Sequence, residues 1–124
     1  MSPALPIDRI PSPPLAPGDD PIDLDHLHRM TLGDAELRHE ALVMFLRQTA
    51  QLLLMLGARP GDRAVLAHTL KGSARAIGAF AVAKAAEALE AAIRNGIDQA
   101  PALAEVEATV APARALIEAI LEQP

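Results

Sequence analysis

The chain has 124 residues, an apolar content of 51%, a formal net charge of −5 and no cysteine. That length suits one domain with one hydrophobic core. The negative charge argues against nucleic-acid binding, which needs a concentrated basic face, and the absence of cysteine excludes disulfides, thiolate metal sites and a cysteine nucleophile. Ala, Leu and Glu are abundant, while there are only two Phe and no Tyr or Trp. This composition favours helices over sheet.

Most of the prolines lie before residue 22. Pro13-Pro14 and Pro17-Gly18 prevent a helical hydrogen-bond ladder, so residues 1–20 are predicted to form a flexible, proline-rich arm. Pro11 and Pro14 have the spacing of a PxxP ligand, although an unstructured tail is the favoured interpretation. The sequence shows neither a secretory signal nor a stretch of roughly 20 apolar residues that could span a bilayer. We therefore expect a cytoplasmic protein that does not contact a membrane.

The first helices are predicted from the spacing of apolar residues after Pro21. Residues 22–30 are expected to form a short helix laid against the main body. A long amphipathic helix is predicted over residues 34–56. Its expected core residues are Leu37, Ala41, Met44, Phe45, Gln48, Leu52, Met55 and Leu56. Gly57 and the Pro60-Gly61-Asp62 cluster are expected to end this helix, and Asp62 can cap or open the next one.

Three more helices are predicted, over residues 63–77, 80–94 and 102–121, separated by Gly78 and by Asn95-Gly96. Pro112 lies inside the last helix, where a kink near Ala108 is expected. The core faces of the three helices are, in order, Leu66, Leu70, Ser73 and Ile77; Val82, Ala86, Leu89 and Ile93; and Leu103, Val106, Val110, Ala113, Ile117 and Ile120. Four amphipathic helices with short connections predict an all-α, antiparallel four-helix bundle over residues 21–124.

His68 is the candidate for chemistry. It lies about 200° around its helix from Leu66, so it points away from the core, on the same side as Lys71, Gly72 and Arg75. An imidazole that is neutral at cytoplasmic pH has a nucleophilic ring nitrogen, which suits phosphoryl capture. Because charge in phosphoryl transfer spreads over three oxygens, Lys71 would face the incoming charge.

Small residues beside His68 support this interpretation. Gly72 and Ala64 lie one turn to either side of the imidazole and would let a partner's active site approach the ring. A glycine inside an exposed helix costs about 1 kcal/mol relative to alanine, so it needs a reason. Packing against a neighbouring helix is another such reason, and an ordinary solvated histidine remains the alternative for His68.

The motif also resembles a known family. The matching residues are His68-Thr69-Leu70-Lys71-Gly72-Ser73-Ala74, Ile77-Gly78-Ala79, Ala85-Ala86 and Leu89-Glu90, with a looser match at Pro21-Ile22-Asp23 and Phe45. Together they resemble the signature of histidine-containing phosphotransfer (HPt) domains. The resemblance implies a four-helix bundle with a short N-terminal helix, with His68 as the phosphorylated residue and Lys71 and Gly72 in supporting positions. Many members have a glutamine or another polar residue that hydrogen-bonds the active imidazole, and Glu90 stands in that place here.

By this resemblance the partners are response-regulator receiver domains or a hybrid sensor kinase. Residues predicted to contact them are Ala64, Val65, Arg75 and Gly78. Magnesium is expected on the receiver, and no cofactor is expected on this chain. The sequence has no glycine-rich nucleotide loop or Walker pattern, so a carrier without kinase activity is predicted, as a monomer.

Two alternatives remain open. One is a non-catalytic helical interaction module that binds or sequesters a signalling partner, and the other is a phosphate sink. The remaining histidines, His26, His28 and His39, are predicted to be solvated surface residues rather than metal ligands.

Overall fold

The computed structural model describes residues 20–123, and the predicted proline-rich arm lies outside them except for Asp20. The helices are α1 (Leu24–Met30), α2 (Ala35–Ala58), a 3-10 turn η2 (Pro60–Asp62), α3 (Arg63–Ile77), α4 (Phe80–Arg94) and α5 (Ala100–Leu121). No strand occurs among residues 20–123. The all-α fold class is therefore confirmed.

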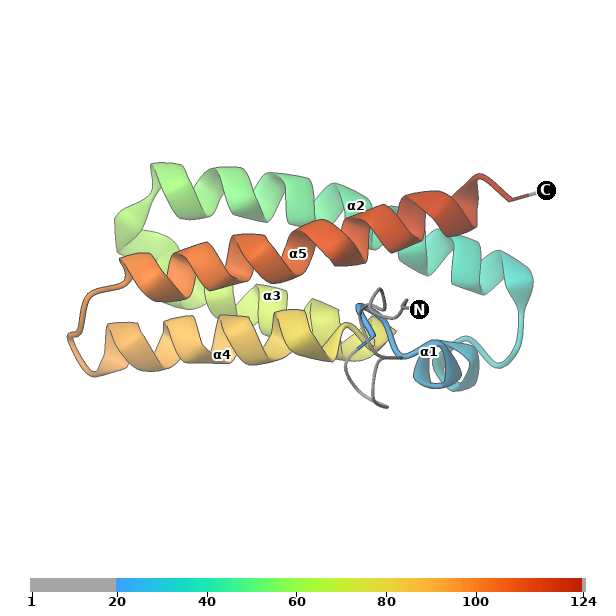
Figure 1. Cartoon of the computed structure of the whole chain (residues 1–124), viewed down its shortest axis with the longest axis horizontal. Helices are drawn as coiled ribbons and strands as arrows, with labels where there is room; N and C mark the ends of the chain where they lie inside the picture. Colours follow the sequence, from blue (N-terminus) through green and yellow to red (C-terminus); the bar gives the residue numbers. More distant parts are fainter. Residues whose placement is uncertain (1–19, 124) are drawn as a thin grey trace, which may run out of the picture.

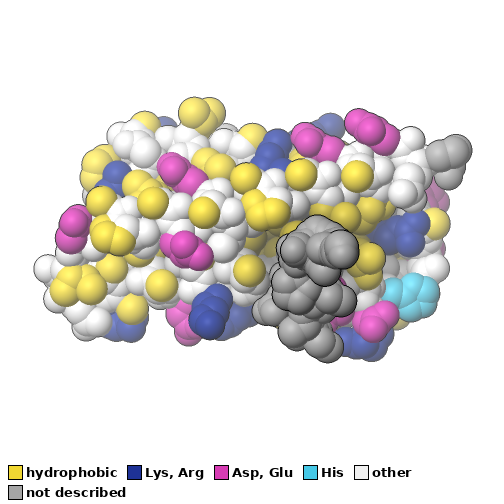
Figure 2. Space-filling model, viewed as in Figure 1, with side chains coloured by type: hydrophobic (Ala, Val, Ile, Leu, Met, Phe, Trp, Pro, Cys, Tyr) yellow, Lys and Arg dark blue, Asp and Glu magenta, His cyan; other side chains and the backbone are white. Residues whose placement is uncertain are grey.

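The four long helices lie side by side, and α1 lies at one end of them (Figure 1). α2 packs against α3 and α5, and α4 packs against the same two helices, so α2 and α4 lie on a diagonal of the bundle. The most extensive contact is between α3 and α4. Charged side chains of both signs are interspersed with hydrophobic ones over the visible face (Figure 2).

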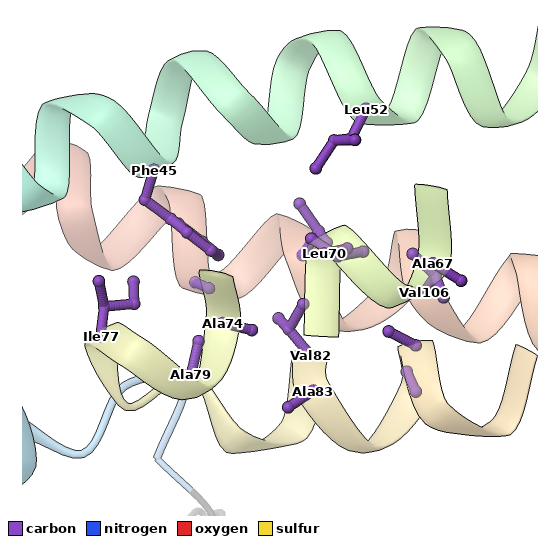
Figure 3. Packing of buried hydrophobic residues seen from close by; sticks show 14 of the residues in the cluster. Phe45, Leu52, Ala67, Leu70, Ala74, Ile77, Ala79, Val82, Ala83 and Val106 are labelled. Carbon is purple, nitrogen blue, oxygen red and sulfur yellow. The ribbon is translucent and has the colours of Figure 1, made fainter. Parts of the chain in front are cut away.

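The core lies between the long helices and is built from aliphatic side chains and alanine. Phe45 and Leu52 of α2 point toward α3, where Leu70 is fully buried (Figure 3). Small residues line the contact between α3 and α4, including the buried Ala67, Ala74, Ala83 and Ala86. Because alanine adds almost no bulk, the two helix backbones approach closely.

α2 buries only part of the predicted face: Phe45, Leu52 and Leu56 lie in the core as expected. Leu37 and Met44 are exposed, and the buried side chains are Leu42, Phe45, Thr49, Leu52 and Leu56. Apolar residues surround most of α2, so its periodicity alone does not select one core face. Thr49 is tolerated in the core because its hydroxyl donates to the Phe45 carbonyl at 2.8 Å and accepts from Arg114 of α5.

α2 also corrects the expectation about apolar stretches. By length and composition it is the one helix of residues 20–123 that would suffice to cross a membrane. In this fold, however, five of its side chains belong to the bundle core. α2 also continues through Gly57 to Ala58, two residues beyond its predicted end.

The start of α3 is stabilised differently from the prediction. Asp62 occupies the N-cap position, but its side chain accepts no capping hydrogen bond. Instead, Arg63 joins three segments: its Nε donates to the Leu56 carbonyl at 2.7 Å and its Nη1 donates to Gln99 Oε1 at 3.1 Å. The boundaries of α3 and α4 are as predicted. α5 begins two residues early and runs on through Pro112, and the kink near Ala108 stays a prediction.

α1 is attached to the end of α3 through Gly78. Asp23 caps α1 by accepting from the His26 amide at 3.1 Å, and its own amide donates to the Gly78 carbonyl at 2.9 Å. Gly78 has a φ of +87°, and a Cβ there would lie 2.8 Å from the Asp23 carbonyl oxygen. Only glycine fits such a position without strain. Gly78 is buried, so its predicted contact with a partner is wrong.

The other histidines divide into two groups. His28 and His39 are exposed, as predicted. His26 is partly buried, and its ring meets the ring of Phe80 edge to face with centroids 5.0 Å apart. The solvated interpretation of His26 is therefore wrong, because α1 turns this side chain toward the start of α4.

Candidate functional site

His68 lies near the middle of α3 and points away from the core. Leu66, Ala67 and Leu70 are buried on the other side of the helix, which holds His68 outward with 72% of its side chain exposed. The outward direction predicted from helical periodicity is confirmed. The imidazole can therefore be reached by a protein that docks on α3.

Glu90 of α4 contacts this imidazole. The Glu90 Oε2 atom lies 3.0 Å from His68 Nδ1, although the two residues are 22 positions apart in the chain. The tight turn at Gly78 folds α4 back along α3 and brings them together. A carboxylate can only accept, so a neutral His68 carries its proton on Nδ1 in this contact. Nε2 is then the nitrogen with the free lone pair, and no residue between 20 and 123 hydrogen-bonds to it.

Lys71 completes the cluster, but it does not face outward. Its Nζ lies 2.7 Å from the other carboxylate oxygen of Glu90, and both side chains are about five-sixths buried, with exposures of 16% and 17%. Lys71 was predicted to face the incoming phosphoryl charge directly. In the structure it forms an ion pair with Glu90 instead. His68, Lys71 and Glu90 form a continuous chain of contacts, which we call the imidazole–carboxylate–lysine cluster.

The cluster keeps Glu90 ionised. Burial raises the pKa of the Glu90 carboxyl, but hydrogen bonds from Lys71 and His68, together with their charges, lower that pKa by more. The pKa of Glu90 therefore lies below the ordinary value for a glutamate. At neutral pH the Glu90 carboxylate is therefore negatively charged beside His68 Nδ1, and the Lys71 ammonium group neutralises it through its other oxygen.

The surface around His68 is open at Gly72. A Cβ added there would have no neighbouring heavy atom within 4 Å, so the packing explanation for this glycine is excluded among the described residues. Ala64 and Val65 are also exposed. Arg75 is exposed on the same helix, with its Nη2 3.8 Å from Glu87 Oε1.

Sequence reasoning had named every member of the cluster, but it did not anticipate the contact between Lys71 and Glu90. A weak signal was available: Glu90 lies on the helix that follows a short turn, and such a hairpin brings residues of the two helices into contact. The pairing of Arg75 with Glu87 was likewise not anticipated.

A four-helix bundle with a solvent-facing histidine, one ring nitrogen held by a carboxylate and the other open, has the form of a phosphotransfer domain. Residues 40–123, more than half of the chain, match the sequence model of the Hpt domain family. The chain belongs to this family. Comparison with curated proteins gave no match. At the family level, Hpt domains carry phosphoryl groups on histidine in two-component phosphorelays, acting with receiver domains and kinases rather than as kinases themselves. The domain boundary at residue 21, outside the matched region, stays a prediction.

Proposed function

We propose that this chain carries a phosphoryl group on Nε2 of His68 and exchanges it with the aspartate of response-regulator receiver domains or of a hybrid sensor kinase. The observation that supports this most is the asymmetry of the imidazole: Nδ1 lies 3.0 Å from Glu90, while the side chain as a whole is mostly exposed. Glu90 orients the ring through Nδ1, and Nε2 is available to accept a phosphoryl group. That is the arrangement a nucleophilic histidine needs.

In the transfer step, the Nε2 lone pair attacks the phosphorus of the receiver's aspartyl phosphate. The N–P bond forms as the P–O bond to the aspartate breaks, and that bond's electron pair leaves with the aspartate carboxylate. The ring keeps its Nδ1 proton and gains a positive charge. Glu90 stabilises this charge because its carboxylate faces Nδ1. Transfer in the opposite direction reverses the same bonds.

The neighbouring residues act on approach and on charge. Lys71 neutralises Glu90, which reduces the repulsion between that carboxylate and the phosphoryl group. Gly72 and Ala64 leave the space above the ring open, and Val65 and Arg75 provide exposed contacts for the receiver. Magnesium is held by the receiver in this proposal, and the exchange takes place in the cytoplasm.

The test is incubation of the full chain with a phosphorylated receiver domain. We expect an acid-labile, alkali-stable phosphoryl label on His68 and no label on the His68→Gln variant. The variant should fold and bind the receiver like the parent, because His68 lies outside the core.

Binding without a label on the parent would assign the chain to the class of non-catalytic interaction modules. Rapid loss of the label to water, without transfer to any receiver, would identify a phosphate sink.

A further inference from the structure

The outer face of α2 exposes three large hydrophobic residues, Leu37, Met44 and Leu54. α2 packs only against α3 and α5 among the long helices that border it, and Met44 and Leu54 are 60% and 75% exposed on its free side. Between the charged ends of this face lies a shallow hollow of about 330 Å³. It is lined by His39, Glu40, Val43, Met44 and Arg47. Hydrophobic side chains appear along the upper left edge, where the C-terminal half of α2 lies (Figure 2).

The charges on this face form a pattern that is complementary to itself. Glu40 and Arg47 are seven residues apart, so they share one side of α2 about 10.5 Å apart along its axis. Neither forms an ion pair with any residue between 20 and 123. If two copies pack antiparallel about a two-fold axis between Val43 and Met44, Glu40 of each copy lies opposite Arg47 of the other.

The same alignment matches the apolar residues. Successive residues lie 100° apart around the helix, so Met44 and Val43 fall on opposite sides of the line from Glu40 to Arg47. About the two-fold axis, Met44 of one copy therefore meets Met44 of the other, and Val43 meets Val43. Leu54 comes opposite the turn that carries Leu32, a residue with 84% of its surface exposed. One register thus pairs both charges and brings the exposed Met44 side chains of the two copies together.

We propose that this face of α2, from Glu36 to Leu54, binds a second copy of the chain and forms an antiparallel, two-fold dimer. This departs from the monomer predicted from the sequence and goes beyond the proposed phosphotransfer. The contact is about 27 Å long and involves one helix from each copy, so it falls at the small end of interfaces, below roughly 1,200 Å². We expect a dimer that dissociates on dilution through the micromolar range.

The dimer leaves both phosphoryl-accepting sites free. His68 lies against Glu90 at the seam between α3 and α4, and α4 is diagonal to α2 in the bundle. Each copy therefore presents its own His68 on a side other than the shared one.

The test uses charge reversal and sedimentation velocity on the full chain over a range of concentrations. Glu40→Arg and Arg47→Glu should each weaken self-association at least about tenfold, because each creates two like-charge contacts. An equimolar mixture of the two single variants should associate as well as the parent, since every contact in the mixed dimer is then between opposite charges. The double variant should recover self-association for the same reason.

Glu107→Arg on α5 is the matched control, because it changes the net charge as Glu40→Arg does but lies on another helix. It should associate like the parent. The proposal is overturned if the full chain stays monomeric at millimolar concentration, or if the mixed single variants fail to associate. Dimerisation only after removal of residues 1–19 would also overturn it, since that segment would then be the occupant of the face. No phosphoryl donor is present, so this result is independent of the proposed function.

Discussion

Replacing Glu90 by glutamine tests the proposed role of the carboxylate beside His68. Glutamine keeps an oxygen that can accept the proton of His68 Nδ1, now 3.0 Å from Glu90 Oε2, but it removes the negative charge. The variant therefore separates orientation of the ring from stabilisation of the positive charge that the ring gains when Nε2 is phosphorylated. Glu90→Ala removes both the hydrogen-bond acceptor that orients the ring and the negative charge.

The size of the effect follows from Coulomb's law. Opposite unit charges about 4 Å apart interact by roughly 4 kcal/mol at an effective dielectric of 20 and by about 1 kcal/mol in water. Glu90 is mostly buried but His68 is mostly exposed, and Lys71, 2.7 Å from Glu90, offsets part of the attraction. We therefore expect Glu90→Gln to lose about 1 to 2 kcal/mol of transition-state stabilisation, which slows transfer roughly 5- to 30-fold. Glu90→Ala should be slower still.

The measurement is single-turnover transfer from a phosphorylated receiver, followed by rapid quench at saturating receiver. Glu87→Gln is the matched control: it removes the same charge one turn away on α4, where the carboxylate is exposed and lies 3.8 Å from Arg75. It should transfer at the parent rate. If both Glu90 variants also transfer at the parent rate, the carboxylate has no part in the reaction.

Gly72→Leu should slow transfer while raising the free energy of unfolding by about 1 kcal/mol, since a Cβ at this position meets no heavy atom within 4 Å in the free protein and leucine favours helix; parent-like transfer would refute the clearance argument. Gly78→Ala should lower the free energy of unfolding by about 2 kcal/mol, because a side chain disfavours the positive φ and its Cβ would lie 2.8 Å from the Asp23 carbonyl oxygen; urea unfolding at parent-like concentrations would contradict this. The lowered pKa of Glu90 makes its stabilising contribution complete above the ordinary glutamate pKa of about 4.3 and causes it to be lost as the pH falls through the lowered value. The difference in unfolding free energy between the parent and Glu90→Gln should accordingly be present at pH 7 and shrink toward pH 3, and a difference that grows on acidification would contradict the assigned sign.

Helix number and most helix ends could be predicted because glycine and proline stand where the chain turns. α3 and α4 were predicted to the residue, since Gly78 and Asn95-Gly96 leave little choice of boundary. α2 was harder. Its apolar residues cover most of its circumference, and only packing against α3 and α5 selects Leu42 and Thr49 for the core in place of Leu37 and Met44. The buried hydroxyl of Thr49 accepts a hydrogen bond from Arg114, a residue 65 positions away, and local periodicity contains no information about such a contact.

The same limit applies to Lys71. Its spacing from His68 places both residues on one side of α3, and that spacing alone predicts that the Lys71 ammonium group faces the phosphoryl group. In the structure, however, the Glu90 carboxylate of α4 lies 2.7 Å from that ammonium group, and the partial burial of both side chains strengthens the attraction between the two charges. Lys71 therefore acts on His68 through Glu90: the ammonium group holds one carboxylate oxygen, and the other oxygen holds Nδ1. A helix-by-helix analysis could identify each member of the cluster, but the order in which they connect is set by the close packing of α3 on α4.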